Sequence, residues 1–262
     1  MKRIAIIGGS GIYDLDILNN PHDDVIETEY GTAKVKMGLY EGQEVVFLAR
    51  HGKGHALPPH KINYRANIAA LKKLGVERII GTTSVGGISA KLRPGDFVLL
   101  DQFIDFTKNR TYTFYDDAMH VDMTRPYCPE IRKTVMMAAE MLKVKVHEKG
   151  TYVCTEGPRL ETSAEIKMFA SLGGDVIGMT NVPECILARE AEICYGAIAL
   201  VANPAAGFTD KISYQDIVEM TKSGGETLKS LLTKSIALIP EDRKCSCKDA
   251  LKGAHFGELF TK

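Results

Sequence analysis

Polar residues that could hold an anion stand at the ends of several apolar runs. In "LARHGKGH", Arg50 and His51 end such a run, and an arginine offers a planar fork of donors that suits phosphate. In "IIGTTSVGG", Thr83 and Ser84 place hydroxyls before two glycines, and in "VIGMTNVPE" Thr180 precedes a helix start, which attracts anions. A solvated salt bridge and Ser/Thr turns are the alternatives. Together these residues predict a phosphate held without a metal ion at the strand ends of an open α/β sheet.

The N-terminal stretch "IIGGSGIY" is a weaker signal for the same chemistry. Gly8 and Gly9 let backbone amides approach an anion, and Ser10 adds a hydroxyl. The spacing is not G-x-G-x-x-G, and no P-loop lysine follows. A tight turn is therefore as well supported here as an anion site.

An uncharged amide ends another apolar run, in "YGAIALVANPAAGF". The run stops at Asn203, and Pro204 and Gly207 then end any strand. A side chain at the end of a buried strand is well placed for chemistry, and an amide carries both a donor and an acceptor. The alternative is an ordinary turn residue.

Length and composition describe the protein that must position these groups. The chain has 262 residues, 45% of them hydrophobic, and its 33 basic and 33 acidic residues cancel. This balance favours neither a nucleic-acid partner nor a disordered acidic tail. The apolar runs are too short to span a bilayer, and the one in "MKRIAIIGGSGIY" is too short for a signal peptide. We therefore expect a cytoplasmic protein that binds neither nucleic acid nor membrane.

Predicted strands and helices alternate along the chain, which indicates an α/β fold with an antiparallel portion. No repeat or linker is seen, so residues 1–262 are expected to form a single domain. Ser163 is predicted to cap one helix, and the glycine pair 224–225 to bend another. The expected strands are 2–7, 25–30, 33–40, 43–49, 76–84, 96–105, 145–155, 176–179 and 194–203, and the expected helices are 63–74, 129–143, 163–174, 181–193 and 213–239.

The cysteines divide into single residues and one close pair. Cys245 and Cys247, in "RKCSCKD", are flanked by charge and expected to be exposed. A lone C-x-C supplies too few ligands for zinc, so the pair forms either a disulfide or two plain thiols. The others are expected to be small buried side chains: Cys128, Cys154, Cys185 and Cys194.

The motifs, taken in order, resemble the trimeric purine nucleoside phosphorylase and 5′-methylthioadenosine phosphorylase superfamily, and above all its methylthioadenosine branch. They are "GGSG", "ARHG", "NYRANI", "TTSVGG", "DQFIDFT", "EGPRLET", "GMTNVPE" and "ALVAN". The resemblance implies a twisted mixed central β-sheet, partly barrel-like and flanked by helices. It also implies a pentosyltransferase that uses orthophosphate as co-substrate and needs no cofactor. Phosphate would attack C1′ of the nucleoside and release a free purine and a sugar 1-phosphate.

The same resemblance implies roles for individual residues. Met179 would pack on the sugar. His120 would be donated to a neighbouring subunit's site, which implies a homotrimer. The C-x-C pair is similar to one in archaeal members that form dimers of trimers, so a hexamer is the alternative. The residues expected to bind phosphate are Ser10, Arg50, His51, Thr83, Ser84 and Thr180.

Two departures from the methylthioadenosine pattern concern the purine. Those enzymes carry an Asp at the end of this strand and another two residues on, where this chain has Asn203 and Ala205. Glu161 stands where they have a Ser, and a carboxylate can accept from the N1–H that 6-oxopurines possess and adenine lacks. The pair Glu161 and Asn203 therefore predicts catalysis on 6-oxopurines. The alternatives are a helix-capping carboxylate and a turn residue.

The 5′ end of the sugar is assigned by resemblance to Tyr214. A tyrosine could bond a 5′-hydroxyl or pack on a methylthio sulfur. The main expectation is a purine-salvage enzyme acting on inosine, guanosine or 5′-methylthioinosine. The alternatives are a 5′-methylthioadenosine phosphorylase and a purine-binding protein without catalysis.

Overall fold

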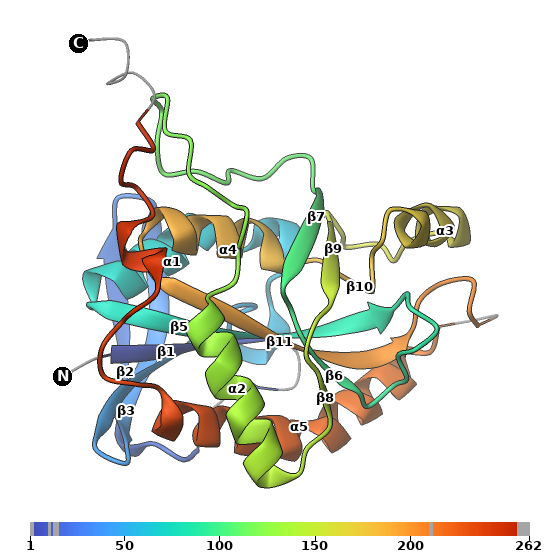
Figure 1. Cartoon of the computed structure of the whole chain (residues 1–262), viewed down its shortest axis with the longest axis horizontal. Helices are drawn as coiled ribbons and strands as arrows, with labels where there is room; N and C mark the ends of the chain where they lie inside the picture. Colours follow the sequence, from blue (N-terminus) through green and yellow to red (C-terminus); the bar gives the residue numbers. More distant parts are fainter. Residues whose placement is uncertain (1–2, 10–11, 13–15, 210–211, 256–262) are drawn as a thin grey trace.

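The computed structural model describes residues 3–9, 12, 16–209 and 212–255. They form a mixed sheet with helices on both faces (Figure 1). The strands are β1 (Arg3–Gly8), β2 (Asn19–Thr28), β3 (Gly31–Tyr40), β4 (Gln43–Ala49), β5 (Val76–Gly87), β6 (Phe97–Leu99), β7 (Gln102–Phe106), β8 (Val146–His147), β9 (Thr151–Thr155), β10 (Val176–Gly178) and β11 (Cys194–Pro204). The helices are α1 (Tyr64–Lys73), α2 (Pro129–Leu142), α3 (Ser163–Ser171), α4 (Asn181–Glu190) and α5 (Tyr214–Leu238).

The long strand β5 is the centre of the sheet. The strand order is β2-β3-β4-β1-β5-β10-β9-β7, and β11 also pairs with β5 and connects through β6 to β8. The neighbours β4, β1, β5 and β11 run parallel to one another. Their carboxyl ends therefore meet at one edge, which brings the polar strand ends together.

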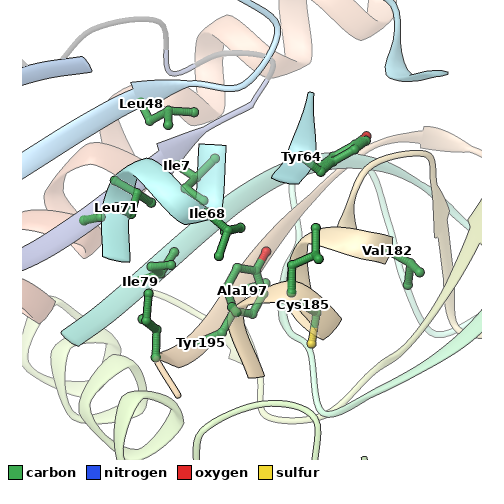
Figure 2. Close-up of a cluster of buried hydrophobic side chains, with 14 of the residues drawn as sticks. Ile7, Leu48, Tyr64, Ile68, Leu71, Ile79, Val182, Cys185, Tyr195 and Ala197 are labelled. Carbon is green, nitrogen blue, oxygen red and sulfur yellow. The ribbon is translucent and has the colours of Figure 1, made fainter. Parts of the chain in front are cut away.

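Alternate residues of the central strands bury opposite faces of the sheet, as expected for a sheet covered on both sides. In β1, Ala5 and Ile7 pack with α1 and α4, in the cluster that Figure 2 shows. Ile4 and Ile6 pack with α2 and α5 on the other face. The predicted α/β fold with a mixed sheet is confirmed. In the part of the chain that the structure describes, no helix is long and apolar enough to cross a bilayer.

Two helix details differ from expectation or refine it. The N-cap of α3 is Thr162, whose side chain accepts from the Glu165 amide in a capping box, so the prediction of Ser163 was wrong by one residue. Helix α5 continues through the glycine pair. A Cβ at Gly224 would lie 2.7 Å from Leu200 Cδ2, so this glycine allows α5 to pack closely on β11.

The predicted strand 96–105 is two strands, β6 and β7. The chain changes partners between them: β6 pairs with β11, and β7 pairs with β9. Asp101, at the junction, accepts from the Gly150 amide at 2.9 Å. An apolar run in the sequence contains no signal for such a change of partner.

Candidate functional site

A cavity of about 450 Å³ opens at the carboxyl ends of β4, β5, β10 and β11. Ser10 lies outside the described residues, and His120 is not among the residues that line this cavity of its own chain. The structure brings together all of the other residues predicted to bind phosphate or nucleoside: Arg50, His51, Thr83, Ser84, Glu161, Met179, Thr180, Asn203, Ala205 and Tyr214.

Arg50 is held rigidly at one end of the cavity. The residue is 1% exposed, and its side chain forms a two-pronged ion pair with Glu184, with Nε–Oε2 and Nη2–Oε1 both at 2.6 Å. Nη1 donates to the carbonyl of Thr82 at 2.9 Å. Burial lowers the pKa of Arg50, but the Glu184 carboxylate outweighs this and holds the pKa above its ordinary value. These contacts use three of the five N–H groups of the guanidinium, which leaves one on each terminal nitrogen for a ligand.

Gly9, directly after β1, packs against the arginine. The Gly9 amide donates to Thr82 Oγ1 at 3.0 Å, so it is not offered to an anion as the sequence suggested. A Cβ on Gly9 would lie 2.5 Å from the Thr82 carbonyl and 2.9 Å from Arg50 Nη1. Glycine is therefore needed here because the backbone passes close to the guanidinium.

His51 is neutral beside this arginine. Burial, followed by the charge of Arg50, lowers the pKa of His51 to about 4. Nδ1 bonds the Leu57 carbonyl at 2.8 Å, and a carbonyl can only accept, so Nδ1 carries the proton and Nε2 the lone pair. The ring stacks on His55 with centroids 3.9 Å apart. The site thus combines an arginine, a neutral imidazole and the hydroxyl residues Thr83 and Thr180.

Glu184 was not singled out from the sequence, although it stands in the quoted motif "GMTNVPE". It is 1% exposed, and Tyr195 Oη donates to its Oε1 at 2.7 Å. Asn181 Nδ2 in turn donates to Tyr195 Oη at 3.2 Å, and Tyr127 donates to Asn181 Oδ1. The sequence did contain a signal for this role. Glu184 lies four positions before the apolar residue Ala188, so both fall on the same face of the predicted helix. A charge on such a face needs a buried partner.

A β-bulge positions Asn203 at the opposite end of the cavity. Along β11, Val201 pairs with Val85 but Asn203 pairs with Gly86, so the register shifts at Ala202. Such a bulge redirects the side chains that follow it. The Asn203 Nδ2 donates to the Pro204 carbonyl at 2.7 Å. This bond orients the amide and leaves its second N–H and its Oδ1 for a ligand. Asn203 belongs to the strand, so the alternative of a turn residue is wrong.

Glu161 lies on the segment between β9 and α3. Its Oε1 accepts from Thr155 Oγ1 at 2.6 Å, and it plays no part in the capping box of α3, so the alternative of a capping carboxylate is wrong. Burial raises the pKa of the Glu161 carboxyl, while the bond from Thr155 lowers it. Glu161 is half-buried and lines the same cavity as Asn203.

The remaining lining residues frame the space between these two ends. Met179 packs against Gly157, where a Cβ would lie 2.5 Å from the methionine sulfur. Tyr214 is the first residue of α5 and is 69% exposed at the mouth of the cavity. Ala205 is buried beside Gly86. Met179 and Ala205 thus add apolar surface to a cavity that also contains the polar groups described above.

The cysteine pair is not as expected from its charged neighbours. Cys245 and Cys247 are 8% and 4% exposed, so the expectation of exposure was wrong. Apolar side chains of α2 and α5 cover them. Both are free thiols in the structure, without the disulfide that was one of the two alternatives.

Three comparisons relate this geometry to known proteins. Residues 3–237 match the family model described as "Phosphorylase superfamily". The 6-oxopurine nucleoside phosphorylase of Pyrococcus furiosus is 54% identical over 264 residues, which cover 97% of this chain and 99% of the relative. The S-methyl-5′-thioadenosine phosphorylase of Thermofilum pendens is 48% identical over 96% of this chain and 98% of its own. A crystal structure of a methylthioadenosine phosphorylase from an antarctic soil metagenomic library has a TM-score of 0.90 at 39% identity, over 96% of this chain and 91% of that one.

Proposed function

The chain belongs to the phosphorylase superfamily, and we propose that it is a 6-oxopurine nucleoside phosphorylase, a pentosyltransferase. It cleaves inosine, guanosine or 5′-methylthioinosine with orthophosphate, and releases a free purine and the corresponding sugar 1-phosphate. The observation that carries this proposal is that Glu161 and Asn203 line one cavity with Arg50 and His51. The cavity thus pairs a phosphate end with an end complementary to a 6-oxopurine.

At the phosphate end, the protein positions the nucleophile. The remaining N–H groups of Arg50 donate to phosphate oxygens, together with the hydroxyls of Thr83, Ser84 and Thr180. The lone pair on Nε2 of His51 accepts from a protonated phosphate oxygen. Because Glu184 neutralises Arg50, directed hydrogen bonds hold the phosphate more than net charge does.

At the reacting carbon, one bond forms as another breaks. A phosphate oxygen bonds to C1′, the C1′–N9 bond breaks, and its electron pair moves onto the purine. The sugar passes through an oxocarbenium-like state that the phosphate stabilises from below. A proton from solvent reaches N7, so the base leaves neutral. The reaction proposed here uses no metal or organic cofactor.

At the base end, two side chains read the purine. The Asn203 amide donates to O6 and accepts from the protonated N7, while Glu161 accepts from N1–H. Adenine presents an amino group in place of O6 and has no N1–H. Leaving polar groups unpaired costs about 1–3 kcal/mol each, so the two contacts together favour 6-oxopurines strongly.

A phosphorolysis panel tests the proposal. The wild-type chain is incubated with inosine, guanosine, 5′-methylthioinosine, adenosine and 5′-methylthioadenosine, with and without phosphate, and the released base is quantified. We expect phosphate-dependent release of hypoxanthine and guanine and little adenine. Preferential release of adenine would instead identify a methylthioadenosine phosphorylase, and release of no base would identify a binding protein.

Assembly and location belong to the same proposal and rest on the resemblance. A trimer, or a dimer of trimers, would bring His120 of one subunit to the site of the next. We place the enzyme in the cytoplasm, where purine salvage supplies its nucleosides. Light scattering of the purified chain distinguishes the two assemblies.

A further inference from the structure

Four cysteines far apart in the sequence meet at a single point, which we call the cysteine cluster. Cys128 is the N-cap of α2, Cys194 is the first residue of β11, and Cys245 and Cys247 lie at the short helix Ser246–Asp249. All four are buried, and their Sγ atoms lie within 4.8 Å of one another. The Sγ of Cys245 is 3.6 Å from that of Cys128 and 3.3 Å from that of Cys194.

We propose that the cysteine cluster is a structural zinc site in which four thiolates hold Zn²⁺. Zinc in structural sites takes four ligands in a tetrahedron, with Zn–S distances of about 2.3 Å. In such a tetrahedron the sulfurs are about 3.8 Å apart. Two separations in the cluster are 3.3 and 3.6 Å, and no pair is more than 4.8 Å apart. The C-x-C pair alone supplies too few ligands, but the fold adds Cys128 and Cys194.

The geometry favours a shared ion over paired disulfides. A disulfide joins sulfurs about 2.05 Å apart, and a sulfur can form only one such bond. The Sγ of Cys245 instead lies beside two partners at once, at similar distances. A central ion satisfies all four sulfurs together, and on binding it displaces the thiol protons to solvent.

A buried arginine offers the charge that such a site needs. Four thiolates and one Zn²⁺ carry a net negative charge in an apolar setting. Arg189 is 9% exposed, and its Nη1 donates to Cys247 Sγ at 3.7 Å. Its Nη2 donates to the Arg125 carbonyl, and its Nε has no acceptor among the described residues. Donors of this kind orient and stabilise metal-bound thiolates.

The site would fasten the C-terminal segment and not take part in turnover. The Lys244 amide donates to Glu130 Oε1 at 2.7 Å, and Arg243 Nη1 donates to the Glu192 carbonyl at 2.8 Å, so the segment already rests on α2 and on the turn before β11. Cys194 and Asn203 stand at opposite ends of β11, about 30 Å apart at the rise of a strand. The ion would therefore stabilise the fold at a distance from the reaction.

Metal analysis of the full chain tests this inference. The protein is purified without added metal or chelator, and its zinc is measured by mass spectrometry. We expect about one zinc ion per chain, its loss in Cys128→Ser and Cys245→Ser, and its retention in the matched control Cys185→Ser, which alters a buried thiol outside the cluster. Equal zinc in all four proteins, iron in place of zinc, or a wild-type chain that neither contains nor takes up zinc would overturn the proposal.

A second measurement needs no variant, in case the cysteine variants do not fold. Wild-type protein stripped with a chelator under reducing conditions is titrated with Co²⁺, and we expect the visible absorption of a tetrahedral cobalt–thiolate site. Thiols are also counted in protein denatured with chelator but without reductant. All six should react if the cluster held a metal. Two reactive thiols, those of Cys154 and Cys185, would identify a pair of disulfides and contradict the zinc site.

Discussion

The two ends of the cavity are built in different ways. At the phosphate end, Arg50 and Glu184 are almost fully buried and are joined by two 2.6 Å contacts. At the base end, Glu161 and Asn203 are half-buried. The Glu161 carboxylate accepts a hydrogen bond from Thr155, and the Asn203 amide donates one to the Pro204 carbonyl. The phosphate end is thus part of the protein core, whereas the base end lies on the surface of that core.

This difference separates contacts on which the folded state depends from contacts that it can lose. A substitution at the phosphate end disturbs a buried ion pair and the sheet around it. A substitution at the base end exchanges one ligand contact and leaves the core in place. Specificity for the purine can therefore change without loss of the phosphate site, and the following predictions test this separation.

The largest effect is expected for Glu184→Ala. Removal of one partner leaves the Arg50 charge buried and unpaired, which costs about 3–5 kcal/mol in the free energy of unfolding. Denaturant unfolding measures this loss, and Glu161→Ala is the matched control at the other end, expected to cost less than about 1 kcal/mol. Equal losses of unfolding free energy in the two variants would contradict the view that only the phosphate end is part of the core.

The next largest effect is a pH dependence of the free energy of unfolding that arises from His51. Its pKa is about 4 in the folded state and 6.5 in the unfolded chain, so the native state binds fewer protons between these values. The free energy of unfolding should therefore fall as the pH falls from 6.5 to 4, with a contribution from this group of at most about 3.4 kcal/mol. Unfolding measured across this window should show a flatter slope in His51→Gln. An unchanged slope would contradict the assignment.

A smaller effect is expected for Glu161→Ala in turnover. Loss of the acceptor leaves the purine N1–H unpaired, at a cost of about 1–3 kcal/mol, so kcat/KM for inosine should fall about five- to 150-fold. KM for phosphate should stay the same, since the phosphate end is untouched. Steady-state kinetics with both substrates checks this, and a parallel rise in the phosphate KM would show that the two ends are coupled.

The smallest effect is expected for Tyr214→Phe, at the exposed mouth of the cavity. Loss of one hydroxyl at such a surface changes free energies by about 0.5 kcal/mol or less unless it contacts the substrate. Kinetics with inosine and 5′-methylthioinosine should then change about equally. A selective loss with inosine would assign the tyrosine hydroxyl to the 5′-hydroxyl of the sugar.

Local patterns in the sequence predicted much of this site, because the end of a buried strand can be recognised where a polar residue follows a short apolar run. Arg50, Thr83, Thr180 and Asn203 each follow a short apolar run, and parallel pairing brings such ends to one edge. The purine roles proposed for Glu161 and Asn203 came from the family resemblance and not from spacing.

Features that depend on distant contacts were missed. Glu184 forms its ion pair with Arg50, which lies 134 residues away in the sequence. Cys245 contacts Cys128, which lies 117 residues away. No local pattern encodes such partners. The cap of α3 was missed for a different reason: Thr162 and Ser163 are adjacent residues of similar capping ability, and the choice between them depends on the path of the preceding segment.

The most direct test of the separation between the two ends is the specificity of the double variant Glu161→Ser with Asn203→Asp. The specificity constants for inosine and adenosine are measured for the wild type and the double variant, together with KM for phosphate. We predict that the inosine-to-adenosine ratio falls by about tenfold or more while the phosphate KM stays unchanged. An unchanged ratio would contradict the claim that these two residues select the purine.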